Sequence, residues 1–215
     1  MITYKKSQVL YALWNTLRNP ANYEKKPSPI FARRLDKLQS VNVPLLPEER
    51  TGQAGYDNEF TEPQVFLIAI ALILMDSGFG LGTAGFFIHH ARPSLLKQYE
   101  RIMKNRPSPL MEHEDEDKTI WLILQNKDLR ELYPAHIMKK YSKGDEMNGW
   151  SGKGPSPLII NPTYAFGKDG RNKVLDRTVQ GGSHSHALVL EIAKMASVLT
   201  DTLQKAPVLK RGRHK

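Results

Sequence analysis

Three cationic side chains, Arg33, Arg34 and Lys37, lie within one short segment of helical periodicity, residues 30–39. The apolar residues of this segment recur at helical spacing and form one face, and the three cations fall mostly off that face. Arginine hydrogen-bonds phosphate oxygens and guanine edges, and lysine pairs with phosphates. Because a helix of this kind fits the major groove, these residues predict a helix able to contact duplex DNA.

Three further cations flank this helix in the sequence. Arg50 lies in the segment 48–57, whose glycines and polar residues are typical of a hairpin that leaves the arginine exposed. Lys5 and Lys6 lie near the start of the first predicted helix. We expect Lys37 and Arg50 to contact phosphates, and the two N-terminal lysines to contact the flanking DNA backbone.

The order of these elements resembles the MerR-type winged helix-turn-helix domain over about residues 3–90. The resemblance implies a transcriptional regulator that binds specific sequences in double-stranded DNA and has no enzymatic activity. It also implies a homodimer on two half-sites, with the transcription machinery as a further partner. The matching pieces are 31–39 as recognition helix, 50–56 as wing, 61–76 as third helix and 78–81 as the turn after it.

A glycine motif predicts a competing function. Gly80, Gly82 and Gly85 match the pattern G-x-G-x-x-G, in which glycines let a pyrophosphate approach the start of a helix. The alternative is therefore a nucleotide-binding enzyme. However, the preceding apolar run, residues 65–75, is longer than a usual buried strand, and no alternating series of strands and helices follows. The competing explanation for these glycines is structural, namely that they allow two helices to cross closely.

Histidine and cysteine usage bears on metals and cofactors. The histidines His89 with His90 and His184 with His186 form two close sets, but metal-binding histidines on a helix usually stand four positions apart. We therefore expect no metal and no other cofactor. The absence of cysteine excludes disulfides and thiolate sites. Because disulfide-stapled domains are typical of secreted proteins, a cytoplasmic location is expected.

The charge of the chain favours a polyanionic partner. Its 215 residues carry 31 Lys+Arg against 22 Asp+Glu, a net charge of +9. The net charge is +5 over residues 1–50, −3 over 111–150 and +7 over 151–215. The positive charge of residues 1–50 therefore lies on the elements that are predicted to contact DNA. The longest apolar run has 11 residues, about half of what a membrane-crossing helix needs, so no membrane partner is expected.

Periodicity predicts a protein that is mainly α with some β, an α+β class. The predicted helix starts are Ser7, Ser28 with Pro29, and Thr61 with Gln64. Further helices are expected over residues 83–90, 94–104, 128–141 and 184–204, and strands over 119–125 and 158–166.

Two prolines and an acidic run predict a linker over residues 107–117. It would separate a winged helix-turn-helix domain, residues 1–106, from a small α+β domain, residues 118–215. The apolar stripe of the helix 184–204 predicts the seam of a homodimer. A third functional alternative is a protein-interaction adaptor whose basic surface is incidental.

Overall fold

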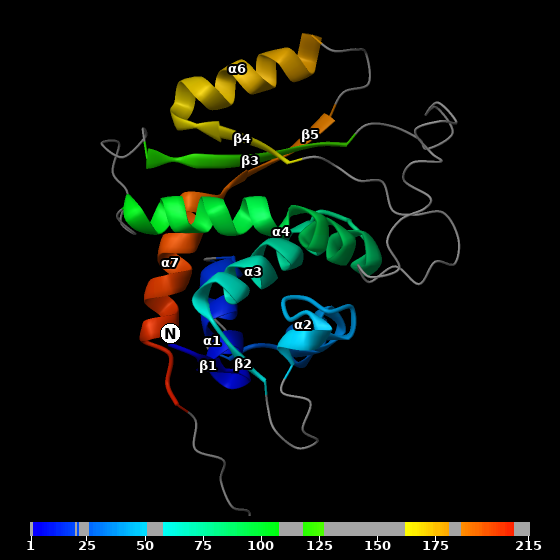
Figure 1. Cartoon of the computed structure of the whole chain (residues 1–215), viewed down its shortest axis with the longest axis vertical. Coiled ribbons are helices and arrows are strands. Elements are labelled where there is room, and N and C mark those ends of the chain that lie inside the picture. Colours follow the sequence, from blue (N-terminus) through cyan, green and yellow to red (C-terminus); the bar gives the residue numbers. More distant parts are fainter. Residues whose placement is uncertain are drawn as a thin grey trace, which may run out of the picture.

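Helices dominate the structure, a computed structural model that describes residues 2–19, 21, 26–50, 58–107, 118–126, 162–180 and 186–208 (Figure 1). The fold class is mainly α with a small β contribution, as the sequence predicts. The helices are α1 (Lys6–Leu17), α2 (Pro29–Ser40), α3 (Glu62–Asp76), α4 (Leu81–Lys104), α6 (Gly167–Gln180) and α7 (Ile192–Gln204), with a short 3-10 helix at Pro47–Glu49. The strands are β1 (Tyr4–Lys5), β2 (Glu59–Phe60), β3 (Ile120–Asn126), β4 (Thr163–Phe166) and β5 (His186–Glu191).

The first three helices begin close to their predicted starts. Helix α2 begins at Pro29, and the Ser28 hydroxyl accepts a hydrogen bond from the backbone N–H of Phe31 at 3.1 Å. Helix α3 follows the predicted capping pair, because the N–H of Thr61 donates to Gln64 Oε1 at 2.9 Å. Helix α1 instead begins at Lys6, so the predicted cap Ser7 lies inside it. Local capping chemistry therefore indicates the starts of α2 and α3 but not that of α1.

Helix α3 is the centre of the core. The residues from Val65 to Leu72 are all buried, so this helix is apolar on every side and needs neighbours all round it. It packs against α1, α2, α4 and α7. The prediction of a buried helix over the apolar run is therefore confirmed. Within the described ranges, no helix combines the length and apolar character needed to cross a membrane.

Helix α4 is one helix where the sequence predicts two. Pro93 lies inside it and lacks the N–H that would continue the hydrogen-bond ladder, which is why a break was expected there. Ser94, where the second helix was expected to begin, instead donates its hydroxyl to the carbonyl of Ala91 at 2.8 Å. The prediction of separate helices over 83–90 and 94–104 is therefore wrong, because packing holds α4 together across the proline.

A three-stranded antiparallel sheet, in the order β4-β3-β5, lies between two helical layers. Figure 1 shows α6 over one face of the sheet and α4 and α7 on the other. Ile120, Leu122 and Leu124 of β3 join the main hydrophobic core, while the ring of Trp121 lies 4.8 Å from the Arg171 guanidinium of α6. The sheet therefore has one deeply buried face and one face covered by a polar helix.

The predicted helix 184–204 and its dimer seam need correction. The described part of this segment is strand β5 followed by helix α7, and the Glu191 carboxylate caps α7 by accepting from the N–H groups of Ala193 and Lys194, each at 2.9 Å. Ile192, Leu199 and Leu203 are at most 1% exposed and lie in the core of their own chain. The apolar stripe therefore joins α7 to α1, α3 and α4, and it is not a free surface for a second copy.

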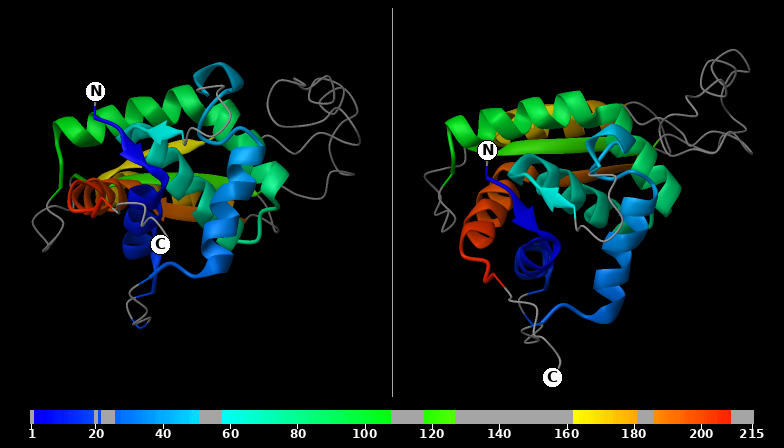
Figure 2. Two further views of the ribbon diagram at one scale, coloured as in Figure 1. Left: turned by 90° about the horizontal axis from the view of Figure 1, so that it is seen from below. Right: turned by 60° about the horizontal axis from the view of Figure 1, so that its bottom comes forward.

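The two predicted domains share one hydrophobic core among the described residues. Leu13 and Leu35, from the first predicted domain, belong to the same hydrophobic cluster as Leu122 and Leu199, from the second. Helix α1 lies between α7 and α2 in both views of Figure 2. Several expected features lie outside the described residues, namely residues 51–57 of the wing, the acidic linker after Pro107, the helix 128–141, the start of the strand 158–166, and His184.

Candidate nucleic-acid interface

Helix α2, the predicted recognition helix, is held on the body by a narrow apolar face. Leu35 and Leu38 are fully buried, and the ring of Phe31 meets that of Trp14 edge to face at 5.3 Å between centroids. Figure 2 shows α2 at the periphery of the molecule. This anchoring leaves the opposite face of α2 in solvent.

That solvent face carries Ile30, Arg33 and Lys37, which are spaced so that they share one side of the helix. Ile30 is 69% exposed. Within the described part of the chain, the side chains of Arg33 and Lys37 make no hydrogen bond or ion pair. Both cations were predicted from the sequence but Ile30 was not, although its isolated position off the apolar face was the available signal.

Two of the predicted DNA-contacting cations are instead paired with carboxylates of the same chain. Lys6 pairs with Asp36 of α2, and Arg34 pairs with Asp76 at the end of α3. These pairs join residues 30 and 42 positions apart. Partly exposed ion pairs of this kind contribute about 0–1 kcal/mol. Their main effect is on geometry, because each pair orients its cation toward a carboxylate of another element, while Lys6 and Arg34 stay 35% and 38% exposed.

Arg50 also has partners within the chain. Its guanidinium donates to the carbonyl of Gln39, near the end of α2, and to Asn42 Oδ1 at 2.6 Å. A cation at this position complements the negative end of the helix dipole. The structure therefore places Arg50 as a cap of α2, at the base of the predicted wing.

The segment 41–50 is held on α4 by two residues, His89 and Arg92, that were not predicted to have this role. His89 Nε2 lies 3.0 Å from the carbonyl of Val41, and Arg92 donates to the carbonyl of Pro44 at 2.6 Å. Arg92 also forms a bidentate pair with Glu49 at 2.7 and 2.9 Å. The chain entering the predicted wing is thereby fixed relative to α2 and α4.

Lys5 is exposed in strand β1 and pairs in register with Glu59 of β2. Its backbone N–H donates to Gln8 Oε1 at 3.1 Å, which fixes the start of α1. Its ammonium group remains in solvent, as a phosphate contact requires.

The glycine motif does not have the layout of a dinucleotide site. A helix, α3, precedes it where that site needs a strand. Gly80 precedes α4, and a Cβ on Gly82 would meet open space, whereas a Cβ on Gly85 would lie 3.0 Å from Val41 Cγ2. Gly85 therefore permits the close approach of α4 to the segment after α2, whereas a Cβ on Gly80 or Gly82 would meet nothing within 4 Å, so these two glycines are not needed for a tight crossing.

No protein-family model, curated protein or solved structure matches this chain. The case for a function therefore rests on the chain's own residues. Across the described ranges, no group of three histidine, aspartate or glutamate side chains is arranged to hold a metal ion.

Proposed function

We propose that this protein binds double-stranded DNA as a cytoplasmic transcriptional regulator of the winged helix-turn-helix type. The observation that carries the proposal is the solvent face of α2, on which Ile30, Arg33 and Lys37 have no partner among the described residues. A peripheral helix with such a face can enter a major groove without disturbing the core.

Each residue of this face has a contact that suits its chemistry. Arg33 can donate two hydrogen bonds to a guanine edge, Lys37 can pair with a phosphate, and Ile30 can pack on a thymine methyl group. Lys5 supplies a further phosphate contact from β1. Arg34, Lys6 and Arg50 support the interface by positioning α2, since each already has partners in the chain.

The fastened segment 41–50 supports a wing beside this helix. Because His89 and Arg92 hold this segment on α4, Arg50, its last described residue, is placed next to the end of α2. The homodimer expected from the sequence remains part of the proposal. It needs a surface other than the α7 stripe, whose residues are buried in the chain's own core.

Gel shifts on a random duplex pool at several salt concentrations test the proposal. We expect wild-type binding that weakens steeply with salt, because bound cations displace counterions from DNA. Replacing Arg33 and Lys37 together by alanine should weaken binding by about 10- to 100-fold and reduce the salt slope by about 1–2.

The matched control is Lys173→Ala with Arg177→Ala on α6. These cations are exposed, have the same spacing as Arg33 and Lys37, and lie at the far end of the molecule from α2 (Figure 1). The control should bind DNA nearly as well as wild type. Equal losses in both pairs would show that binding follows net charge alone, and absent or salt-insensitive wild-type binding would overturn the proposal.

A further inference from the structure

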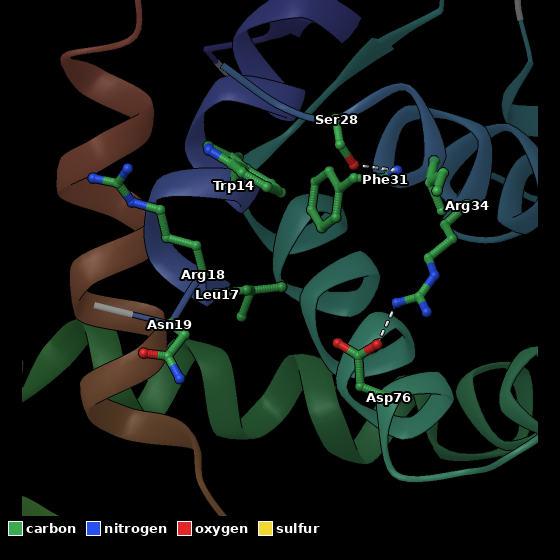
Figure 3. Close-up of a pocket in the computed structure, with 9 residues that line it drawn as sticks. Trp14, Leu17, Arg18, Asn19, Ser28, Phe31, Arg34 and Asp76 are labelled. Atoms are coloured by element: carbon green, nitrogen blue, oxygen red, sulfur yellow. Dashed lines mark hydrogen bonds and ion pairs between the residues drawn. The ribbon is translucent and has the colours of Figure 1, made fainter. Parts of the chain in front are cut away.

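A pocket of about 270 Å³ opens where the end of α1 meets the start of α2 and the end of α3 (Figure 3). Its walls come from three helices that are distant in the sequence. One of these is the proposed recognition helix. The lining residues that carry the argument are Trp14, Leu17, Ile30, Phe31, Arg34 and Asp76.

One side of the pocket is aromatic and apolar. The rings of Trp14 and Phe31 meet at an interplanar angle of 71°, and Figure 3 shows Leu17 beside them. Trp14 is 8% exposed, so its ring is already held in place before any ligand binds. A rigid wall of this kind suits a flat apolar ring, which can stack or pack edge-on against it.

The other side of the pocket holds an arginine, Arg34, paired with a carboxylate, Asp76. Arg34 uses Nη1 to bind Asp76 Oδ1, and its other N–H groups have no partner among the described residues. A guanidinium has five N–H donors in a planar fork that matches a carboxylate. The pocket also borders the start of α2, the positive end of the helix dipole. These features favour a negatively charged group beside the aromatic wall.

We propose that this pocket binds a small aromatic carboxylate, with the ring on Trp14 and Phe31 and the carboxylate on Arg34. The volume is enough for a single ring with a short acidic side chain. Asp76 competes with the ligand for Arg34, but their pair is partly exposed, and such pairs contribute only about 0–1 kcal/mol.

Occupancy of the pocket should change DNA binding, a consequence that rests on the proposed function. Phe31 and Arg34 belong to the same turn of α2 as Arg33. A ligand that draws Arg34 away from Asp76 therefore alters how α2 is held against α1 and α3. The pocket would then act as an effector site for the recognition helix.

Phenylacetate and its neutral analogue phenylacetamide are suitable probes, each titrated up to roughly 20 mM because ligands of this size bind with a Kd of about 0.1–10 mM. Thermal unfolding and tryptophan fluorescence report the binding. We expect phenylacetate to raise Tm in a saturable way and phenylacetamide to have little effect, since a ligand of the folded state stabilises it. Equal effects of the two probes, or no effect of phenylacetate, would overturn the proposal.

Variants locate the site. Arg34→Gln should abolish the preference for the carboxylate, whereas Arg177→Gln, which removes an exposed arginine of α6, should keep it. Asp76→Asn should tighten phenylacetate binding several-fold because it frees Arg34, and a misfolded variant cannot produce that gain. Unchanged binding in both Arg34→Gln and Asp76→Asn would place the ligand elsewhere and refute the proposal.

Gel shifts with and without phenylacetate separate this proposal from the proposed function. A change in DNA affinity that is lost in Arg34→Gln supports both. Carboxylate binding without any DNA binding supports the pocket and refutes the DNA-binding function. DNA binding without carboxylate binding refutes the pocket alone.

Discussion

His89 is a buried imidazole that joins α4 to the segment preceding the predicted wing. Burial lowers its pKa, the hydrogen bond to the Val41 carbonyl opposes that shift, and the nearby Arg92 cation adds to it. The neutral ring is therefore favoured in the folded protein. Protonation has to overcome both desolvation and the repulsion from Arg92.

The lowered pKa makes a prediction about acid stability. The unfolded chain binds a proton at His89 near pH 6.5, whereas the folded chain does so only at lower pH, so stability rises with pH across this window. We expect wild type to lose free energy of unfolding between pH 7.5 and 5.5, and His89→Gln to lose less over the same range.

Urea unfolding at the two pH values measures this difference. His90→Gln removes the exposed neighbouring imidazole and is the matched control. If His89→Gln and His90→Gln showed the same pH dependence as wild type, His89 would have no part in acid sensitivity.

The cations of the candidate interface show where sequence reasoning stops at the residue scale. The sequence correctly predicts that Arg33 and Lys37 lie off the apolar face of their helix. It does not predict that Arg34 meets Asp76, because that contact depends on how α2 and α3 pack. Helical periodicity predicts which side of a helix a residue lies on. It does not predict which charged residue of another element packs against that side.

At the scale of elements, α7 shows that an apolar stripe has two meanings. Ile192, Leu199 and Leu203 recur at helical spacing, which fits a dimer seam and an internal core equally well. The second meaning applies, since all three lie in the core of the same chain. Helical spacing correctly predicts a helix over the described residues 192–204. It does not predict which surface its apolar face packs against.

This assignment predicts the effect of truncating the stripe. Ile192→Ala and Leu199→Ala should each lower the free energy of unfolding by about 2–5 kcal/mol, because each leaves a cavity in a packed core. The mass of the native protein measured by light scattering should not change. Lys194→Ala, on the exposed side of α7, should change stability little.

A dimer seam would give the opposite pattern. Both core variants would then reduce the native mass while leaving the stability of the separated monomer near that of wild type. Denaturant unfolding and light scattering on the same samples distinguish the two cases.

Helix starts were more predictable than strands and helix continuity. Ser28 with Pro29, and Thr61 with Gln64, carry their capping chemistry within four residues. In contrast, β5 forms a strand before α7 because the backbone of β5 pairs with that of β3. This pairing runs from Trp121 opposite Glu191 to Asn126 opposite His186. Pairing between segments about 70 residues apart leaves no local signature, so the segment was expected to be helical.

At the scale of the whole molecule, polar contacts tie the ends of the described chain together. Glu62 of α3 accepts hydrogen bonds from the hydroxyls of Tyr4 at 2.9 Å and Tyr99 at 3.2 Å. Arg106, just after α4, donates to the Ser197 hydroxyl at 3.0 Å and pairs with Asp201 of α7. The Arg106 contacts and the shared core join the parts on either side of the predicted linker.

A single core predicts a single unfolding transition. In a Trp150→Phe background, the two remaining tryptophans, Trp14 in α1 and Trp121 in β3, lie on opposite sides of the predicted linker and report on the two parts separately. Urea unfolding followed in Trp14→Phe and Trp121→Phe variants should show one cooperative step in each, with fluorescence and circular dichroism coincident within each variant. Two resolved steps would mean that the parts fold independently.

The central position of α3 has a consequence for synthesis on the ribosome. Helix α3 is apolar on every side, yet α7, which covers part of it, begins roughly 115 residues later in the chain. At about 5–20 residues per second, translation leaves that side of α3 uncovered for about 6–23 s. The nascent chain therefore has a long interval in which a chaperone can bind α3, and the final fold closes only after translation has passed α7.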